Sequence, residues 1–174
     1  MRLKYVVKKE EHFDNIKEIL KTKLEISDRL LLKLKKENLI FLNNTPCNIK
    51  SPVNSNDIVE ISLDYDEDNT NIIPTKMNLK ILFEDDYMLV LNKPAGYPIH
   101  PSMLHYEDSI SNGVRYCFDS IGLKKKIRPV NRLDKDTSGI VIFAKNEYIQ
   151  ECLVKQMKNN TFVKEYIAIC ERNI

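Results

Sequence analysis

Residues 129–139 have the sequence PVNRLDKDTSG and lead directly into residues 140–145, IVIFAK. The second piece is mostly β-branched, aliphatic and aromatic, which is typical of a strand and too short for a confident helix. The first piece is a polar loop with an arginine, two aspartates and a glycine. Because a buried strand holds the side chains of an adjoining loop in place, reactive groups are often found there. We therefore expect Asp134 to be the reactive residue of this chain.

Composition limits the class of protein. The 174 residues are 43% hydrophobic and 30% charged, with a formal net charge of +2. These values suit one ordinary domain, or a small module plus a larger one, with a sizeable core. The net charge is too small to indicate a nucleic-acid partner, so local clusters of basic residues matter more. The N-terminus is too charged for a secretory signal and no apolar run reaches bilayer length, which predicts a cytoplasmic protein without a membrane segment.

The cysteine and histidine positions do not indicate a metal or redox site. His100 and His105 lie five apart without a third ligand, so no metal is expected. The cysteines are scattered with no close pair, which predicts reduced thiols and leaves a cysteine nucleophile as the remote alternative. They are Cys47, Cys117, Cys152 and Cys170.

Residues 1–66 are predicted to form a separate small module. The periodicity of its apolar side chains and its turn residues predict two helices and two strands. These are helices over 13–24 and from the capping residue Ser27 onward, and strands over 39–42 and 57–63, with an asparagine turn at 43–44. The second helix presents Arg29 and Lys33 on its polar side, and charge alone favours an ordinary solvated helix face.

The order of these elements resembles the S-four-like RNA-binding domain, a small α/β module of ribosomal proteins and RNA-modifying enzymes. This sequence departs from the usual pattern because asparagines occupy a turn where glycine is common. The resemblance implies an RNA anchor on the basic helix face, with Arg29 and Lys33 as phosphate contacts.

Residues 67–78 are predicted to be an acidic and polar linker, in a run of acidic residues that begins at Asp64 and lacks apolar periodicity. Such a linker would repel a phosphate backbone, so RNA is expected to be held on either side of it. Residues 79–174 form the second predicted domain. Its expected strands span 80–83, 87–91, 140–145 and 161–170, and its expected helices span 108–118 and 147–157.

The residues around Asp134 allow more than one chemistry. Arg132 could form an ion pair with Asp134 that only stiffens a turn, or neighbouring positive charge could keep the carboxylate ionised as a nucleophile or base. The two aspartates at 134 and 136 also have the spacing found in haloacid-dehalogenase-type phosphatases. Those enzymes have an apolar strand running directly into the first aspartate, and here the approach is polar and contains Pro129.

Four stretches together resemble the ribosomal large-subunit type of RNA pseudouridine synthase. Arg132-Leu133-Asp134 followed by Thr137-Ser138-Gly139 is similar to the signature of that family. LFEDD at 82–86 and LVLNKPAG at 89–96 are similar to its first motif, which His100-Pro101 closes, and KEYIA at 164–168 is similar to the motif that carries its tyrosine.

The resemblance implies an enzyme that isomerises uridine within RNA, breaking the glycosidic bond to nitrogen and rejoining the base through carbon. Asp134 would attack the nucleoside, and the base must be flipped out to be reached. Arg132 would fill the vacated space and hold the neighbouring RNA. Tyr166 would stack on the uracil. No cofactor or metal is implied, and the partner would be ribosomal RNA.

The family pattern also differs from this chain in two places. The family usually has histidine where this chain has Asn131, and its catalytic domain continues past the tyrosine to a motif whose arginine pairs with the aspartate. The implied α+β fold is therefore an S-four-like module plus an incomplete, mainly antiparallel sheet. We expect an N-terminal portion of a synthase that is weakly active or inactive and dimerises through an exposed sheet edge. The alternative is a non-catalytic RNA-binding fragment.

Overall fold

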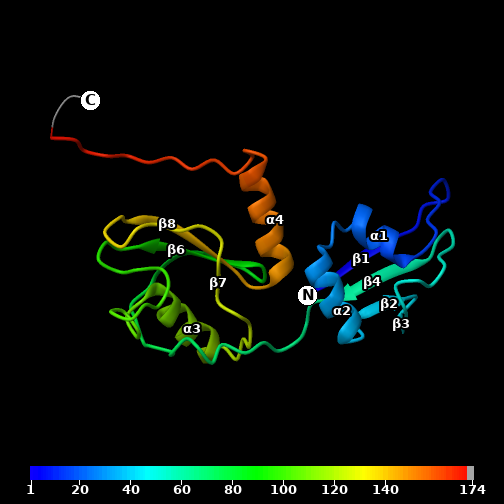
Figure 1. The fold of residues 1–174 in the computed structure, drawn as a ribbon, viewed down its shortest axis with the longest axis horizontal. Helices are drawn as coiled ribbons and strands as arrows, with labels where there is room; N and C mark the ends of the chain where they lie inside the picture. The colour runs from blue at the N-terminus through cyan, green and yellow to red at the C-terminus, as the bar shows by residue number, and fades with distance from the viewer. Residues whose placement is uncertain (172–174) are drawn as a thin grey trace.

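The structure is a computed structural model that describes residues 1–171. The chain forms two four-stranded sheets, each with its own hydrophobic core and its own helices (Figure 1). Every strand pairing in both sheets is antiparallel. The mixture of helices with antiparallel sheets makes the fold α+β.

The first sheet has the strand order β1-β4-β2-β3. Its strands are β1 (Arg2–Val6), β4 (Ile58–Ser62), β2 (Ile40–Leu42) and β3 (Thr45–Pro46). Two helices, α1 (Ile16–Thr22) and α2 (Asp28–Lys36), contribute apolar residues to the same core as β4. Strand β1 was not predicted, although charged and apolar residues alternate over residues 2–6 as in a half-buried strand. It pairs with β4, more than 50 residues away in sequence.

The predicted asparagine turn between β2 and β3 has a clear conformational basis. Asn43 and Asn44 have φ angles of 52° and 66°, so both are left-handed. Two left-handed residues are what the tightest hairpin turns require, and asparagine tolerates this region better than most side chains. The turn therefore forms without a glycine.

The second sheet has the strand order β5-β6-β8-β7. Its strands are β5 (Lys80–Glu84), β6 (Met88–Lys93), β8 (Gly139–Ala144) and β7 (Arg128–Pro129). Helix α3 (Ile110–Ser120) packs Val114 and Phe118 against Leu91 and Phe143 in one core. β5 is an edge strand with every residue exposed.

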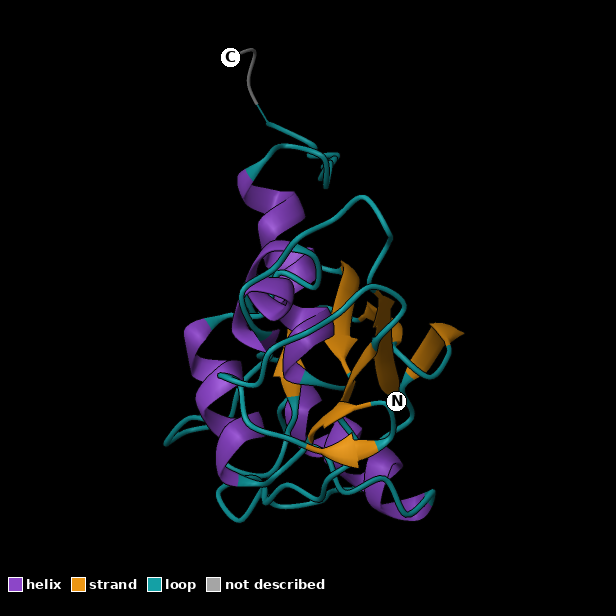
Figure 2. Ribbon diagram, turned by 90° about the vertical axis from the view of Figure 1, so that its right-hand side faces the viewer, coloured by secondary structure: helices purple, strands orange, loops and turns teal. Residues whose placement is uncertain are grey.

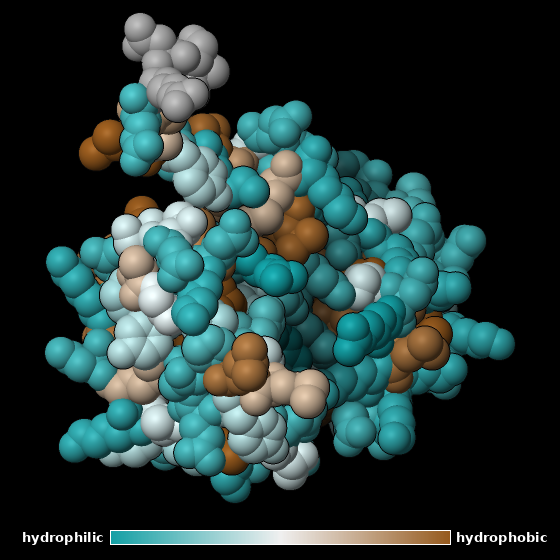
Figure 3. All heavy atoms as spheres, turned by 60° about the vertical axis from the view of Figure 1, so that its left-hand side comes forward, coloured by the Kyte–Doolittle hydropathy of each residue, from teal (hydrophilic) through white to brown (hydrophobic). Residues whose placement is uncertain are grey.

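The prediction of a strand over 161–170 is wrong. After helix α4 (Glu147–Lys158), these residues run away from the body of the molecule without pairing to either sheet (Figures 1 and 2). The segment has the β-branched composition of a strand, but a strand also needs a neighbouring backbone to bond with. Its apolar residues Ile167 and Ile169 are fully exposed, and brown patches mark the segment next to the grey terminus in Figure 3.

No helix within residues 1–171 is long and apolar enough to cross a membrane. Residues 64–79, which include the predicted linker, form no helix or strand. They connect the two sheets along one side of the molecule (Figure 1).

Candidate active site

The loop that carries Asp134 is fastened to strand β8 by Asn131. The side-chain amide of Asn131 donates to the carbonyl of Ile140 and its side-chain oxygen accepts from the amide of Ile142, both at 2.9 Å. The amide of Val130 donates to the carbonyl of Ile142 at 2.7 Å. Ile140 and Ile142 pair with β6 on one edge of β8, and β7 covers only Phe143 and Ala144 on the other. Asn131 therefore satisfies backbone groups on the edge of β8 that β7 leaves uncovered.

The same loop is held from its other side by Lys93, at the end of β6. Lys93 is only 1% exposed, and its ammonium donates to three carbonyl oxygens. These belong to Pro94 at 3.0 Å, Tyr97 at 2.8 Å and Lys135 at 2.8 Å. A buried ammonium has three protons to place, and here each has a carbonyl partner. Lys93 thus ties the turn after β6 to the loop of Asp134.

The two aspartates of the loop point their charge toward solvent. Asp134 and Asp136 are both exposed, and neither carboxylate takes part in a hydrogen bond or an ion pair within residues 1–171. Burial lowers the pKa of the Lys93 ammonium, and the negative charges of Asp136 and Asp134 oppose that shift. Asp134 is therefore a solvent-facing carboxylate on a loop whose backbone is fixed, with buried positive charge behind it.

Arg132 is exposed and does not form an ion pair with Asp134 within the described residues. The ion pair that would merely stiffen a turn is therefore not present. Burial of the imidazole ring lowers the pKa of His100, and the positive charge of nearby Arg132 lowers it further. The guanidinium is thus available for a ligand at the rim of the loop.

Tyr166 lies on a groove shared with the aspartate loop. The groove has a volume of about 560 Å³ and is lined on one side by Leu133 and residues 137–140, and on the other by residues 162–167. Tyr166 is 63% exposed. The structure therefore brings Tyr166 beside the loop of Asp134, on a segment that no strand pairing holds in place.

Arg29 and Lys33 differ in their surroundings although both lie on α2. Arg29 is exposed near the start of the helix. The ammonium of Lys33 is bonded to Glu67 at 2.8 Å and lies 4.0 Å from the centre of the Tyr65 ring. Arg29 is therefore open to solvent, whereas Lys33 is already engaged within the molecule.

Lys93 is the site residue that sequence reasoning missed, although its position carries a signal. Strand β6 alternates, and Leu89, Leu91 and Lys93 share its buried face. A lysine in register with core leucines, directly before a proline, indicates a buried ammonium bound to a loop. No group of three His, Cys, Asp or Glu side chains in the described part of the chain could hold a metal ion.

Comparisons with known proteins indicate the family of this chain. Residues 87–174 match the family model described as RNA pseudouridylate synthase. The chain is 37% identical over 160 residues to "Ribosomal large subunit pseudouridine synthase D" of Borreliella burgdorferi, a match that covers 87% of this chain and 48% of the relative. It is 35% identical over 153 residues to "Uncharacterized RNA pseudouridine synthase YhcT" of Bacillus subtilis, covering 88% of this chain and 50% of the relative.

The chain spans about half the length of these curated relatives. The solved structure of "Human RNA Pseudouridylate Synthase Domain Containing 4" is 24% identical with a TM-score of 0.39, covering 47% of this chain and 30% of that one. A TM-score of that size does not establish a common overall fold. The family match over half the chain and the identity to curated relatives are sufficient to assign the family. This chain belongs to the RNA pseudouridylate synthase family.

Proposed function

We propose that this chain acts in the isomerisation of uridine to pseudouridine in large-subunit ribosomal RNA, in the cytoplasm, and that Asp134 attacks the nucleoside. The observation that carries the proposal is the exposed carboxylate of Asp134 on a loop fixed by Lys93 and Asn131. A nucleophile works best when its backbone is rigid and its reacting atom is open to the substrate. The two curated relatives bear the names of RNA pseudouridine synthases, one of them of the ribosomal large subunit.

The other site residues have roles that follow from their chemistry. A uridine stacked in RNA cannot be reached by Asp134 until it is flipped out of the stack. Arg132 would fill the space that the base leaves, since a planar guanidinium stacks on bases and bonds phosphates. Tyr166 would lie against the flipped uracil, across the groove that it shares with Leu133. None of these roles requires a cofactor.

The N-terminal part would bind RNA as an S-four-like module. The support is the succession of two helices, a hairpin with an asparagine turn and a closing strand, together with exposed Arg29 on α2. Contacts of this kind are made to phosphates and give affinity rather than sequence choice.

A second candidate is an RNA-binding chain that does not convert uridine by itself. The observation that favours it is the 63% exposure of Tyr166 on a segment outside both sheets. A base-stacking residue on an unpaired segment is poorly positioned for catalysis, because small displacements of reacting groups cost large factors in rate.

The experiment is pseudouridine formation on transcripts of large-subunit ribosomal RNA. We expect weak product formation from the chain, none from Asp134→Ala, and the same weak formation from Asp136→Ala, which removes the other exposed carboxylate of the same loop. Loss of product in both variants, or in neither, contradicts the role given to Asp134. RNA binding without product from the unchanged chain supports the second candidate.

The exposed edge strand β5 would also join two copies of the chain. Ile81, Leu82 and Phe83 of β5 are each about half exposed, and an unpaired apolar edge invites pairing with another strand. Sedimentation velocity is the test. We expect a dimer that Leu82→Lys converts to a monomer, and a monomeric unchanged chain contradicts the proposal.

A further inference from the structure

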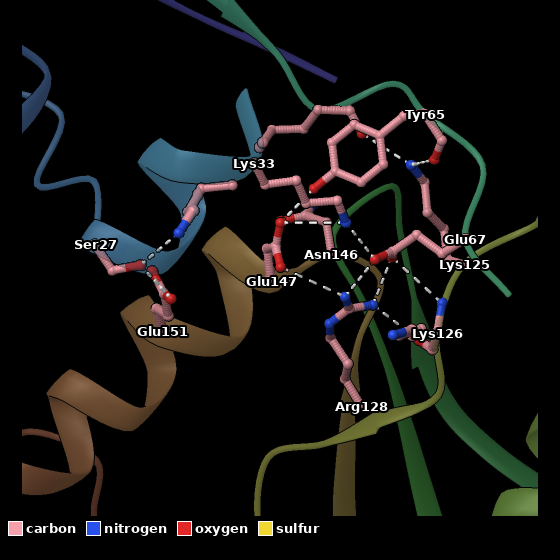
Figure 4. Close-up of polar contacts among 12 residues, drawn as sticks. Ser27, Lys33, Tyr65, Glu67, Lys125, Lys126, Arg128, Asn146, Glu147 and Glu151 are labelled. Carbon is pink, nitrogen blue, oxygen red and sulfur yellow. Dashed lines mark hydrogen bonds and ion pairs between the residues drawn. The ribbon is translucent and has the colours of Figure 1, made fainter. Parts of the chain in front are cut away.

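A cluster of paired charges lies where the two parts of the chain meet (Figure 4). We call it the junction, and its residues are Lys33, Tyr65, Glu67, Arg128 and Glu147. They come from α2 of the N-terminal part, from the connecting segment, from β7 and from α4, so the junction joins segments from both parts of the chain.

Glu67 is the centre of the junction. Its side chain is 3% exposed, and its two oxygens accept from both terminal nitrogens of Arg128, each at 2.7 Å. The ammonium of Lys33 donates to the same carboxylate at 2.8 Å. A carboxylate buried to this extent is stable only when its partners are held in good geometry. Glu67 is thus a fixed contact between α2 and β7 rather than part of a free acidic linker.

Tyr65 and Glu147 close the junction on its other side. The hydroxyl of Tyr65 donates to Glu147 at 2.5 Å, and Lys33 lies over the Tyr65 ring. Lys125 donates to the carbonyls of Leu63 and Tyr65, which fixes the end of the first sheet to the second part. The connecting segment is therefore bonded at both its backbone and its side chains.

Helix α4 extends the contact along the N-terminal part. Glu147, Glu151 and Lys155 are spaced four residues apart and so lie on one helix face. Glu147 faces Lys33, Glu151 accepts from Ser27 at 2.6 Å, and Lys155 pairs with Glu25 at 2.5 Å. The figure shows α2 and α4 side by side at these contacts (Figure 4). Tyr148 of α4 also packs against the N-terminal hydrophobic core.

We propose that the junction locks the two parts into one rigid body, so that RNA is read across the α2 face and the Asp134 loop at one fixed spacing. Glu67 is then a positioning residue for RNA, and Lys33 belongs to the lock rather than to the phosphate contacts. The part of this inference that concerns RNA rests on the proposed function, whereas the rigidity of the junction does not. Two RNA contacts on one rigid body raise affinity only for an RNA whose shape meets both at once.

The first test measures rigidity without RNA. Residual dipolar couplings from residues 1–63 and from residues 80–158 should fit a single alignment tensor in the unchanged chain. Glu67→Gln keeps the shape of the side chain and removes its charge, and we expect it to require two tensors. Asp66→Asn is the matched control, because the neighbouring Asp66 is 76% exposed and pairs only with exposed Lys124. We expect one tensor for this control.

If Glu67→Gln does not fold, Lys33→Met is the second variant. It removes the bond from α2 to Glu67, and it should fold because Lys33 is part-exposed and the pair of Glu67 with Arg128 remains. We expect two tensors for this variant also. Two tensors in the unchanged chain, or one tensor in all variants, would overturn the proposal.

The second test measures the dissociation constant for a large-subunit ribosomal RNA transcript. We expect Glu67→Gln and Lys33→Met each to raise it about tenfold, and Asp66→Asn to leave it unchanged. If Lys33 were a phosphate contact, Glu67→Gln would release it and the affinity would stay equal or rise. A transcript that the unchanged chain does not bind contradicts the proposed function, and the tensors still decide whether the junction is rigid.

Discussion

Two short stretches that carry carboxylates have opposite environments in this molecule. Residues 64–68, DYDED, contain Glu67, whose carboxylate is buried between Arg128 and Lys33. Residues 132–136, RLDKD, contain Asp134, whose carboxylate is exposed with no ion pair in the described chain. The sequence suggested a loose linker for the first stretch and a reactive carboxylate for the second.

The difference arises from residues distant in sequence. Arg128 is 61 residues from Glu67, and Lys33 is 34 residues from it on the other side. The loop of Asp134 is instead held through its backbone, by Lys93 and Asn131, which leaves the side chain unused by the fold. The fold thus holds Glu67 by its side chain and the loop of Asp134 by its backbone. This difference leaves the carboxylate of Asp134 available for chemistry and that of Glu67 committed to structure.

The largest effect expected from this comparison is on turnover. Asp134→Asn should lower pseudouridine formation at saturating RNA by about a thousandfold or more, as loss of an attacking group does in other enzymes. Its free energy of unfolding should change by less than about 0.5 kcal/mol, because an exposed side chain without partners contributes little. Chemical denaturation beside a single-turnover assay measures both quantities, and a large loss of stability would show that Asp134 has a structural role.

Glu67→Gln should lower the free energy of unfolding rather than the turnover. Burial would raise the pKa of Glu67, but hydrogen bonds from Arg128 and Lys33 outweigh it and lower the pKa from 4.5 to about 2. A shift of that size corresponds to about 3 kcal/mol of stability. Because the folded pKa is lowered, the contribution is complete above about pH 5 and is lost as the pH falls from about 4.5 toward 2.

The measurement is the thermal midpoint of the unchanged chain and of Glu67→Gln from pH 7 to pH 3. We expect the unchanged chain to be more stable at pH 7 and the gap to narrow below about pH 4.5. A gap that is constant over the whole range would mean that the charge of Glu67 does not stabilise the fold.

Lys93→Met should be the next largest perturbation. It removes the ammonium that three carbonyls share, and hydrogen bonds from a charged donor are worth about 2 kcal/mol. We expect a loss of about that size in the free energy of unfolding, measured in urea. Lys135→Met is the control, because only the backbone carbonyl of Lys135 takes part in the contact. Equal losses in the two variants would contradict the role of Lys93.

Much of the fold followed from local sequence patterns. The capping of α2 by Ser27, the hairpin at Asn43 and the strand after Gly139 depend on neighbouring residues, so periodicity and turn chemistry predicted them. Strand β1 and the unpaired segment 161–170 depend on whether a distant backbone is present to pair with, which composition does not encode.

The candidate site divides in the same way between local and distant signals. The loop of Asp134 and the nearby Arg132 were found from sequence, because their motif is contiguous. Lys93 was missed although its register with Leu91 indicated burial. Lys33 was assigned to phosphates from the resemblance to the S-four-like domain, and its pairing with Glu67 could not be inferred, since nothing near either residue in sequence indicates the other.

The smallest of the expected effects concerns Asn131. Asn131→Ala removes two hydrogen bonds to β8, at a partly exposed position where water can replace them. We expect a loss of about 1 kcal/mol in the free energy of unfolding and faster amide exchange at Ile142, whose amide would lose its partner. Exchange at Phe143, which pairs with Leu89 of β6 on the opposite edge, should not change. If exchange accelerates equally at both amides, Asn131 supports the whole strand. If it accelerates only at Ile142, Asn131 fastens the loop alone, and the backbone of Asp134 is held by separable contacts that could be loosened one at a time.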